Sequence, residues 1–278
     1  MTVAKARIAR RVLLGTAALA ALWLLAVWPP PVWWATHHPR CTAMMRLRAS
    51  RCPPLRPTAP DRTPPLVRRL VIIGEDSRFR THRGIDFVEL AEAITERRNR
   101  RRGASTITQQ LAKNLYLSPS RSPLRKLKEA VTAVRLELAL SKDRILDLYL
   151  NIAEWGPGIW GVAAASEAYF GVPPSGLTEA QAAALAATLP HPRTSNPTFQ
   201  PARMLARRDL ILAHYHGADV YIPPVPEEIE LDSVPAIPLI EVPIIPVPID
   251  TLMDSIRVPA DSGQESQSTN RNGMTSAM

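Results

Sequence analysis

The feature that most constrains this chain is an uncharged apolar run near its N-terminus. The run extends from Val12 to Trp28, and four basic residues precede it: Lys5, Arg7, Arg10 and Arg11. Its length is at the short end for a bilayer-spanning helix, and Trp33 and Trp34 add interfacial length. Because basic flanks stay in the cytoplasm, the sequence predicts a cytoplasmic segment over 1–11 and a single-pass transmembrane anchor over 12–34.

Two other interpretations of this run are a cleaved signal peptide and a buried core helix. A signal peptide needs small residues at its cleavage site. Trp28, followed by three prolines, occupies that place here. We therefore favour the uncleaved anchor, with the rest of the chain on the outer side of the membrane.

Charge divides the chain into a basic body and an acidic tail. The net charge is +9 overall. From residue 221 onward nine acidic and two basic residues give −7, which leaves +16 for residues 1–220. The body suggests an anionic partner: nucleic acid, a membrane surface or a phosphate-bearing substrate. Nine prolines in the tail oppose a continuous helix or central strand. We expect 220–278 to be an acidic, proline-rich tail that is extended or disordered.

Residues 35–65 are rich in proline and arginine and are predicted to be a linker. The chain's two cysteines, Cys41 and Cys52, lie inside it. In an oxidising compartment they could close a small loop, and the sequence leaves open whether they do. A metal site with His37 and His38 is the alternative, but the spacing matches no common zinc pattern.

Residues 66–219 are predicted to form one mainly helical domain. The apolar spacing has a helical period, and no strand-like alternation appears. Residues that favour helix starts precede each apolar stretch. The predicted caps are Asp86, Ser105, Ser122, Ser141 and Thr178, the last with Gln181 in a capping box, and Gly217 is predicted to stop the last helix.

Polar side chains concentrate in two stretches of this domain. The first holds Glu75, Asp76 and His82, and the second runs from Gly103 to Asn114, followed by a basic cluster with Glu129. Carboxylates are the usual acid and base groups, and clustered Lys and Arg suit a phosphate or pyrophosphate. Ser105 with the free amides of a helix start could hold an anion.

The order and spacing of five motifs closely resemble those of the monofunctional bacterial peptidoglycan glycosyltransferases, from about Pro65 to Arg208. Gly74 and Ala104 are mild departures that remove no reacting group. The motifs are Glu75–Asp86 (EDSRFRTHRGID), Gly103–Asn114 (GASTITQQLAKN), Arg125–Glu129 (RKLKE), Ser141–Asn151 (SKDRILDLYLN), and Gly156–Gly161 (GPGIWG) with Ala163–Gly171 (AAASEAYFG).

The resemblance implies a lysozyme-like helical fold that polymerises lipid II by an inverting reaction. Glu75 would be the general base, and Glu129 the second carboxylate that assists departure of the pyrophosphate. Asp76 and His82 would not contact substrate but would support the residues that do. The expected substrate-binding residues are Lys113, Arg121, Lys128, Ser105, Gln109, Gln110 and Asn114.

The resemblance also sets expectations for cofactors, partners and location. A divalent cation, Mg²⁺ or Mn²⁺, is an open alternative at Glu129, and no organic cofactor is expected. The expected partners are lipid II, the growing lipid-linked glycan, membrane lipids and other cell-wall synthesis proteins, with no nucleic acid. The catalytic domain should lie on the periplasmic side of the inner membrane.

Three other functions fit parts of the sequence. A muramidase-like hydrolase would use a similar Glu, but it has no pyrophosphate to hold with a Lys/Arg cluster. A nucleic-acid binder would fit the basic run at 97–102, yet an extracytoplasmic location and the lack of interleaved aromatic residues oppose it. An inactive wall-assembly scaffold is opposed by the presence of Glu75, Lys113, Arg121 and Glu129.

Overall fold

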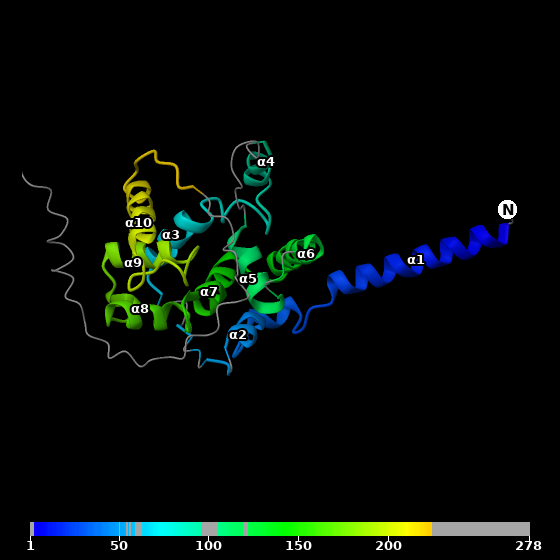
Figure 1. The fold of residues 1–278 in the computed structure, drawn as a ribbon, viewed down its shortest axis with the longest axis horizontal. Coiled ribbons are helices and arrows are strands. Elements are labelled where there is room, and N and C mark those ends of the chain that lie inside the picture. Colours follow the sequence, from blue (N-terminus) through cyan, green and yellow to red (C-terminus); the bar gives the residue numbers. More distant parts are fainter. Residues whose placement is uncertain are drawn as a thin grey trace, which may run out of the picture. The chain divides into compact units, whose positions relative to one another are not determined.

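The protein is described by a computed structural model in which the chain is mainly helical, as the sequence predicts (Figure 1). The structure describes residues 3–49, 51–53, 55, 57–58, 63–95, 105–118, 120 and 122–223. The basic run at 97–102, Arg121 and most of the predicted tail lie outside this set. The helices and strands are α1 (Val3–Leu25), η1 (Pro31–Ala35), α2 (Ala43–Arg48), α3 (Pro65–Glu75), α4 (Phe87–Thr95), α5 (Ile107–Tyr116), α6 (Pro123–Ala139), α7 (Lys142–Ile152), β1 (Glu154–Gly156), β2 (Ile159–Trp160), α8 (Val162–Phe170), η4 (Pro174–Gly176), α9 (Glu179–Thr188) and α10 (Ala202–Tyr215).

Most predicted helix caps are confirmed. The side chains of Ser122 and Ser141 accept amide hydrogen bonds at the starts of α6 and α7, and Thr178 forms its capping box with Gln181. Asp86 accepts the amides of the first turn of α4 at 3.0 and 3.1 Å. The cap predicted at Ser105 is wrong by one residue. Thr106 caps α5, because its hydroxyl is the one that reaches the amide of Gln109.

The centre of the domain is α7, which is buried on almost every side from Ile145 to Ile152. Figure 1 shows it between α5 and α6 on one side and α8 on another, while α3, α9 and α10 pack together. A helix that is enclosed all round must pair the polar side chains that it buries. The carboxylate of Asp147 within it is paired with Arg144 at 2.7 Å.

A short antiparallel hairpin, β1 and β2, follows α7 and was not predicted. Gly161 lies directly after it with φ of +84°, a conformation that glycine adopts without strain. A Cβ there would lie 2.7 Å from the carbonyl oxygen of Asn151, so the chain turns tightly against the end of α7. Gly161 of the fifth motif therefore has a structural function.

The N-terminal segment differs from the prediction of one anchor over 12–34. Helix α1 ends at Leu25, and Pro31 begins the separate turn η1, since prolines interrupt the helix between them. Trp34 is buried rather than interfacial, and its indole donates to the Tyr116 hydroxyl at 2.6 Å. Within the described ranges, no helix combines the length and apolarity that a bilayer crossing requires, so the anchor is not confirmed.

The described part of the predicted linker packs on the domain. Helix α2 buries Met44 and Met45 in the core. From α7, Arg144 donates to the carbonyls of Trp34 and His37 at 2.8 Å, and Asn151 pairs with the backbone of Thr58. These contacts satisfy backbone groups that a free linker would leave to water. We call the described residues of 31–58 the strap.

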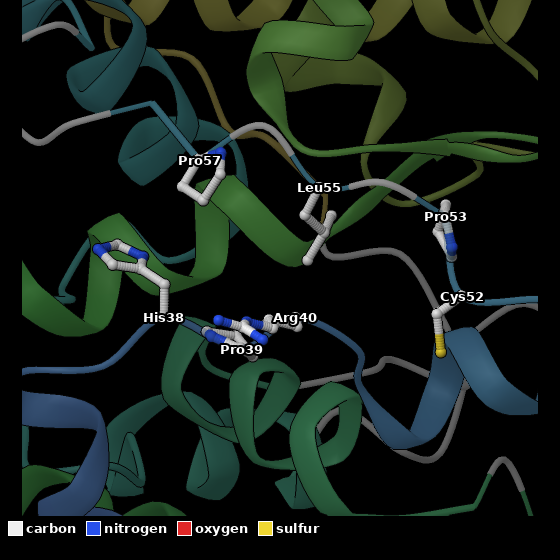
Figure 2. A pocket seen from close by; sticks show the side chains of 7 residues that line it. All are labelled: His38, Pro39, Arg40, Cys52, Pro53, Leu55 and Pro57. Carbon is white, nitrogen blue, oxygen red and sulfur yellow. The ribbon is translucent and has the colours of Figure 1, made fainter.

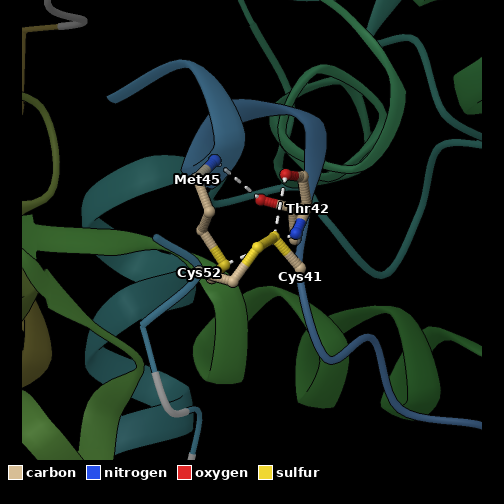
Figure 3. Close-up of a disulfide and its surroundings, with 4 residues drawn as sticks. All are labelled: Cys41, Thr42, Met45 and Cys52. Carbon is tan, nitrogen blue, oxygen red and sulfur yellow. Dashed lines mark hydrogen bonds between the residues drawn. A yellow bond between two sulfur atoms is a disulfide. The ribbon is translucent and has the colours of Figure 1, made fainter. Parts of the chain in front are cut away.

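Cys41 and Cys52 form a disulfide that closes the loop containing α2 (Figure 3). Their Cα atoms are 5.6 Å apart, within the range that a disulfide requires. Next to it, Thr42 caps α2 by accepting the amide of Met45 at 3.2 Å. The alternative of a metal site with His37 and His38 is thereby excluded, because both sulfur atoms are used.

Candidate active site

The candidate base, Glu75, is the last residue of α3. This helix buries Val67, Leu70 and Val71 on one face, and the same face carries Gly74. A Cβ at Gly74 would lie 2.9 Å from Cδ1 of Ile211, so the glycine allows the end of α3 to approach α10 closely. The packing of this apolar face of α3 thus determines how deeply Glu75 is buried.

The Glu75 carboxyl lies in a largely dry environment, with 6% of its side chain exposed. Its Oε2 accepts a hydrogen bond from Nε2 of Gln110 at 2.9 Å, while its buried Oε1 has no hydrogen-bond partner. Burial raises the pKa of Glu75, and the charge of Arg207 and the hydrogen bond from Gln110 partly offset that rise. A carboxylate with a raised pKa and an oxygen that accepts no hydrogen bond is suited to accept a proton.

Gln110 is held in one orientation by Tyr149. The Tyr149 hydroxyl donates to Oε1 of Gln110 at 2.8 Å, so the amide nitrogen is directed at Glu75. The Tyr149 ring is buried on α7, and burial raises the pKa of its hydroxyl, which keeps it a donor. The structure therefore places Gln110 against Glu75, and its predicted contact with substrate stays a prediction.

Asp76 and His82 support the loop behind Glu75, at the place where the sequence put them. Asp76 is buried and accepts the backbone amide of Ile107 at 3.0 Å and Nε2 of His82 at 2.9 Å. These bonds fasten the end of α3 to the start of α5. Asp86 lies close to both side chains, but Arg78 binds its carboxylate through two nitrogens at 2.8 and 3.0 Å. We assign no metal to this cluster.

The second predicted carboxylate, Glu129, is buried in an ion cluster on α6. One oxygen accepts from Arg125 Nη1 at 2.5 Å, and the other pairs with Lys126. Lys126 also donates to the hydroxyl of Ser105 at 2.7 Å, which links Glu129 to the start of α5. With both oxygens paired, Glu129 does not fit the role of a cation ligand in this arrangement.

The remaining predicted substrate residues are spread around α5 and α6. Gln109 is buried, and its side-chain oxygen accepts the amide of Thr106 at 3.0 Å in a capping box. Lys113 and Asn114 are half-buried near the end of α5. The ammonium of Lys128 lies 4.6 Å from the ring centre of Trp23 in α1, and burial lowers its pKa. Arg121 lies outside the described residues.

Three residues near the site were not among the predicted site residues. Lys126 joins Ser105 to Glu129. Its position in the third motif, next to Arg125, is the sequence feature that could have identified it as a site residue. Tyr149 lies in the fourth motif, but no role in the site was predicted for it. Arg207 comes from α10, and its Nη2 lies 3.8 Å from Oε1 of Glu75. No motif or spacing distinguishes it from the basic residues beside it.

A separate cavity of about 520 Å³ lies in the strap. Figure 2 shows two stretches of the strap facing each other across it, and no predicted site residue lines it. The lining residues are His38, Pro39, Arg40, Cys52, Pro53, Leu55 and Pro57.

Comparison with known proteins identifies a family. The model of the transglycosylase family matches residues 53–216. This range includes Glu75 with its neighbours and the ion cluster of Glu129. A biosynthetic peptidoglycan transglycosylase of Azoarcus sp. (strain BH72) is 42% identical over 221 residues, 76% of this chain and 95% of the relative. Relatives with the same name from Aromatoleum aromaticum and Bordetella avium are 42% and 38% identical, covering 69% and 75% of this chain and 89% and 93% of their own lengths.

Proposed function

Because the chain belongs to the transglycosylase family and is a peptidoglycan glycosyltransferase, we propose that it polymerises lipid II into β-1,4-linked glycan strands with Glu75 as the general base. The other product is the polyprenyl pyrophosphate. The observation that carries this proposal is the Glu75 carboxyl, which has a raised pKa, one oxygen fixed by Gln110 and one that accepts no hydrogen bond.

In the proposed reaction Glu75 takes the proton from the 4-hydroxyl of the acceptor sugar. The oxygen attacks the anomeric carbon of the donor, which is the lipid-linked growing chain, and the bond to the pyrophosphate breaks. Attack from the face opposite the leaving group converts an α-linked donor into a β-linked product. A sugar hydroxyl is a weak nucleophile, so a positioned base accelerates this step.

The leaving pyrophosphate needs its negative charge neutralised more than it needs a proton. We propose that Lys113, Arg121 and Lys128 serve this purpose, with Ser105, Gln109, Gln110 and Asn114 along the donor. Fixed cations stabilise charge that develops in the transition state without having to reorganise. Glu129 would act through its ion cluster, in which Lys126 bridges to Ser105. We derive no step through a divalent cation, and restoring activity with Mg²⁺ or Mn²⁺ after chelation tests that alternative.

We also propose that the protein is attached to the bacterial inner membrane through α1, with the domain on the periplasmic side. Large apolar side chains of α1 are exposed, among them Leu13 and Leu19 at 68% each, and Trp28 beyond its end is 86% exposed. Exposed apolar surface of this kind marks a membrane or a protein contact. The disulfide agrees with an oxidising compartment. Other wall-synthesis proteins stay proposed partners.

The proposed function is tested with the purified full chain and labelled lipid II in detergent. We expect polymer that a muramidase cuts to disaccharide units, together with released polyprenyl pyrophosphate. Lipid II that stays monomeric would contradict polymerisation, and shortening of preformed glycan strands would indicate the hydrolase instead. Membrane attachment is tested separately, by fractionating cells that produce the full chain and a variant lacking residues 1–28.

A further inference from the structure

Arg207 reaches from α10 to the end of α3, where the proposed base lies. Its side chain is 11% exposed. Nη2 donates to the carbonyl of Gly74, and Nη1 donates to the carbonyl of Pro223 at 2.7 Å. The same Nη2 lies 3.8 Å from Oε1 of Glu75, too far for a hydrogen bond but close enough for a strong electrostatic interaction. Arg207 is thus fixed by backbone contacts and leaves the buried Oε1 without a hydrogen bond.

The packing of α10 on α3 places the Arg207 side chain beside Glu75. Ile211 lies one helical turn after Arg207, so both residues lie on the same face of α10. Ile211 packs against Gly74, because a Cβ built at Gly74 would lie only 2.9 Å from Cδ1 of Ile211. Ile211 is fully buried. The close approach at Gly74 therefore sets the position of the guanidinium beside the carboxyl.

We propose that Arg207 is a positioning residue for glycosyl transfer, holding the end of α3 in place and keeping Glu75 ionised until the acceptor hydroxyl arrives. This inference rests on the proposed role of Glu75 as the base. Arg207 itself takes no proton and forms no bond in the reaction.

The other groups around Glu75 leave Arg207 as the main counter-charge. Asp76, the next residue, is negative; His191 contributes from the segment after α9, and Gln110 and Tyr149 face the carboxyl from α5 and α7 without charge. Burial raises the pKa of Glu75, and the charge of Arg207 gives the largest opposing effect. Loss of that charge favours the protonated carboxyl, so the pKa of Glu75 rises further and less base is present at neutral pH.

The test compares pH–rate profiles for lipid II polymerisation by full-length variants. Arg207→Gln removes the charge and keeps a polar amide, and Arg207→Lys keeps a charge. Arg208→Gln is the matched control, because Arg208 pairs with the exposed Asp209. We expect the acid limb of Arg207→Gln to move up by about one pH unit, which is about a tenfold loss of rate on that limb. Arg207→Lys should move it by less than about 0.3 unit, and Arg208→Gln should leave it unchanged.

A rate that falls equally at every pH in Arg207→Gln would overturn the inference, as would an equal shift in Arg207→Lys. Circular dichroism establishes that each variant is folded, and Arg207→Met replaces Arg207→Gln if the latter unfolds.

A second measurement separates this inference from the proposed function. Full-length protein with ¹³C-labelled glutamate carboxyls is titrated by NMR without substrate, and the Glu75 signal is assigned by its loss in Glu75→Gln. An unchanged titration in Arg207→Gln would refute the effect of Arg207. A titration that moves upward supports that effect, and if the pH–rate profile then fails to follow it, the role of Glu75 as base is wrong.

Discussion

Removing the disulfide of the strap should destabilise the protein measurably. Cys41 and Cys52 are 11 residues apart, and α2 between them buries Met44 and Met45. By the chain-entropy relation, a loop of this size contributes about 9 cal/mol/K, or about 3 kcal/mol at 25 °C. For a domain of this size, about 3 kcal/mol corresponds to a Tm lower by about 6–12 °C.

The assay is thermal unfolding of the full chain followed by circular dichroism, with and without a thiol reductant. The variant Cys41→Ser/Cys52→Ser should unfold at the lower Tm in both conditions. Wild-type protein should unfold at that lower Tm only when reduced, so the variant also controls for effects of the reductant.

A Tm within about 2 °C of wild type in the double variant would refute this reasoning. It would mean that the contacts of Arg144 and Asn151 hold the strap without the cross-link, or that the loop is already restricted in the unfolded chain. A fall in Tm on reduction of the double variant would show that the reductant acts elsewhere.

Three further predictions concern the site and the tail. Lys113→Ala and Arg121→Ala should each weaken binding of a phosphoglycolipid inhibitor that mimics the lipid pyrophosphate; unchanged affinity in titration calorimetry would remove both from the pyrophosphate site. Tyr149→Phe should lower kcat by up to about tenfold, since Gln110 loses a hydrogen bond of about 1 kcal/mol, while KM stays near wild type; an unchanged kcat would mean that Gln110 needs no such support. Deleting 224–278 should leave the initial rate in detergent within about fivefold of the full chain, because its prolines and acidic residues cannot easily build a core; a larger loss in a folded truncation would place the tail in the catalytic unit.

The sequence predicted the helical domain well because its signals are local. Ser122, Ser141 and Thr178 cap helices through bonds to amides three residues away, and such bonds depend on the neighbouring sequence alone. The start of α5 was misplaced by one residue because Ser105 and Thr106 are both common cap residues and Ser is the more favoured of the two. Contacts with Lys126 and the backbone of Gly84 distinguish them.

The limits of the strap and the tail could not be predicted, because they depend on contacts between residues that are far apart in the sequence. The prolines of 31–58 are typical of a linker, yet bonds from Arg144 and Asn151 on α7 hold this segment on the core. At the other end, Ile222 packs against the core and Pro223 accepts from Arg207, so the domain extends a few residues past 219.

The candidate site was predicted only in part. Motif order placed Asp76 and His82 beside Glu75, and their hydrogen bonds agree with that placement. The hydrogen bond from Gln110 to Glu75 was not predicted, because a sequence does not reveal which partner an amide finds in the fold. Arg207 was missed because 132 residues separate it from Glu75, and only the packing of α10 on α3 brings them together.

The most direct test of the proposed mechanism is the rate of lipid II polymerisation by Glu75→Gln. The full-length variant is assayed with labelled lipid II in detergent beside wild type and Glu167→Gln, which changes an exposed glutamate on α8. Gln keeps the shape of the side chain but cannot accept the acceptor's proton, so the loss should reach about 100-fold or more, typical of removing a general base. We expect Glu167→Gln to match wild type and Glu75→Gln to be folded but inactive. A folded Glu75→Gln that retains more than about a tenth of the wild-type rate would contradict the assignment of Glu75 as the base.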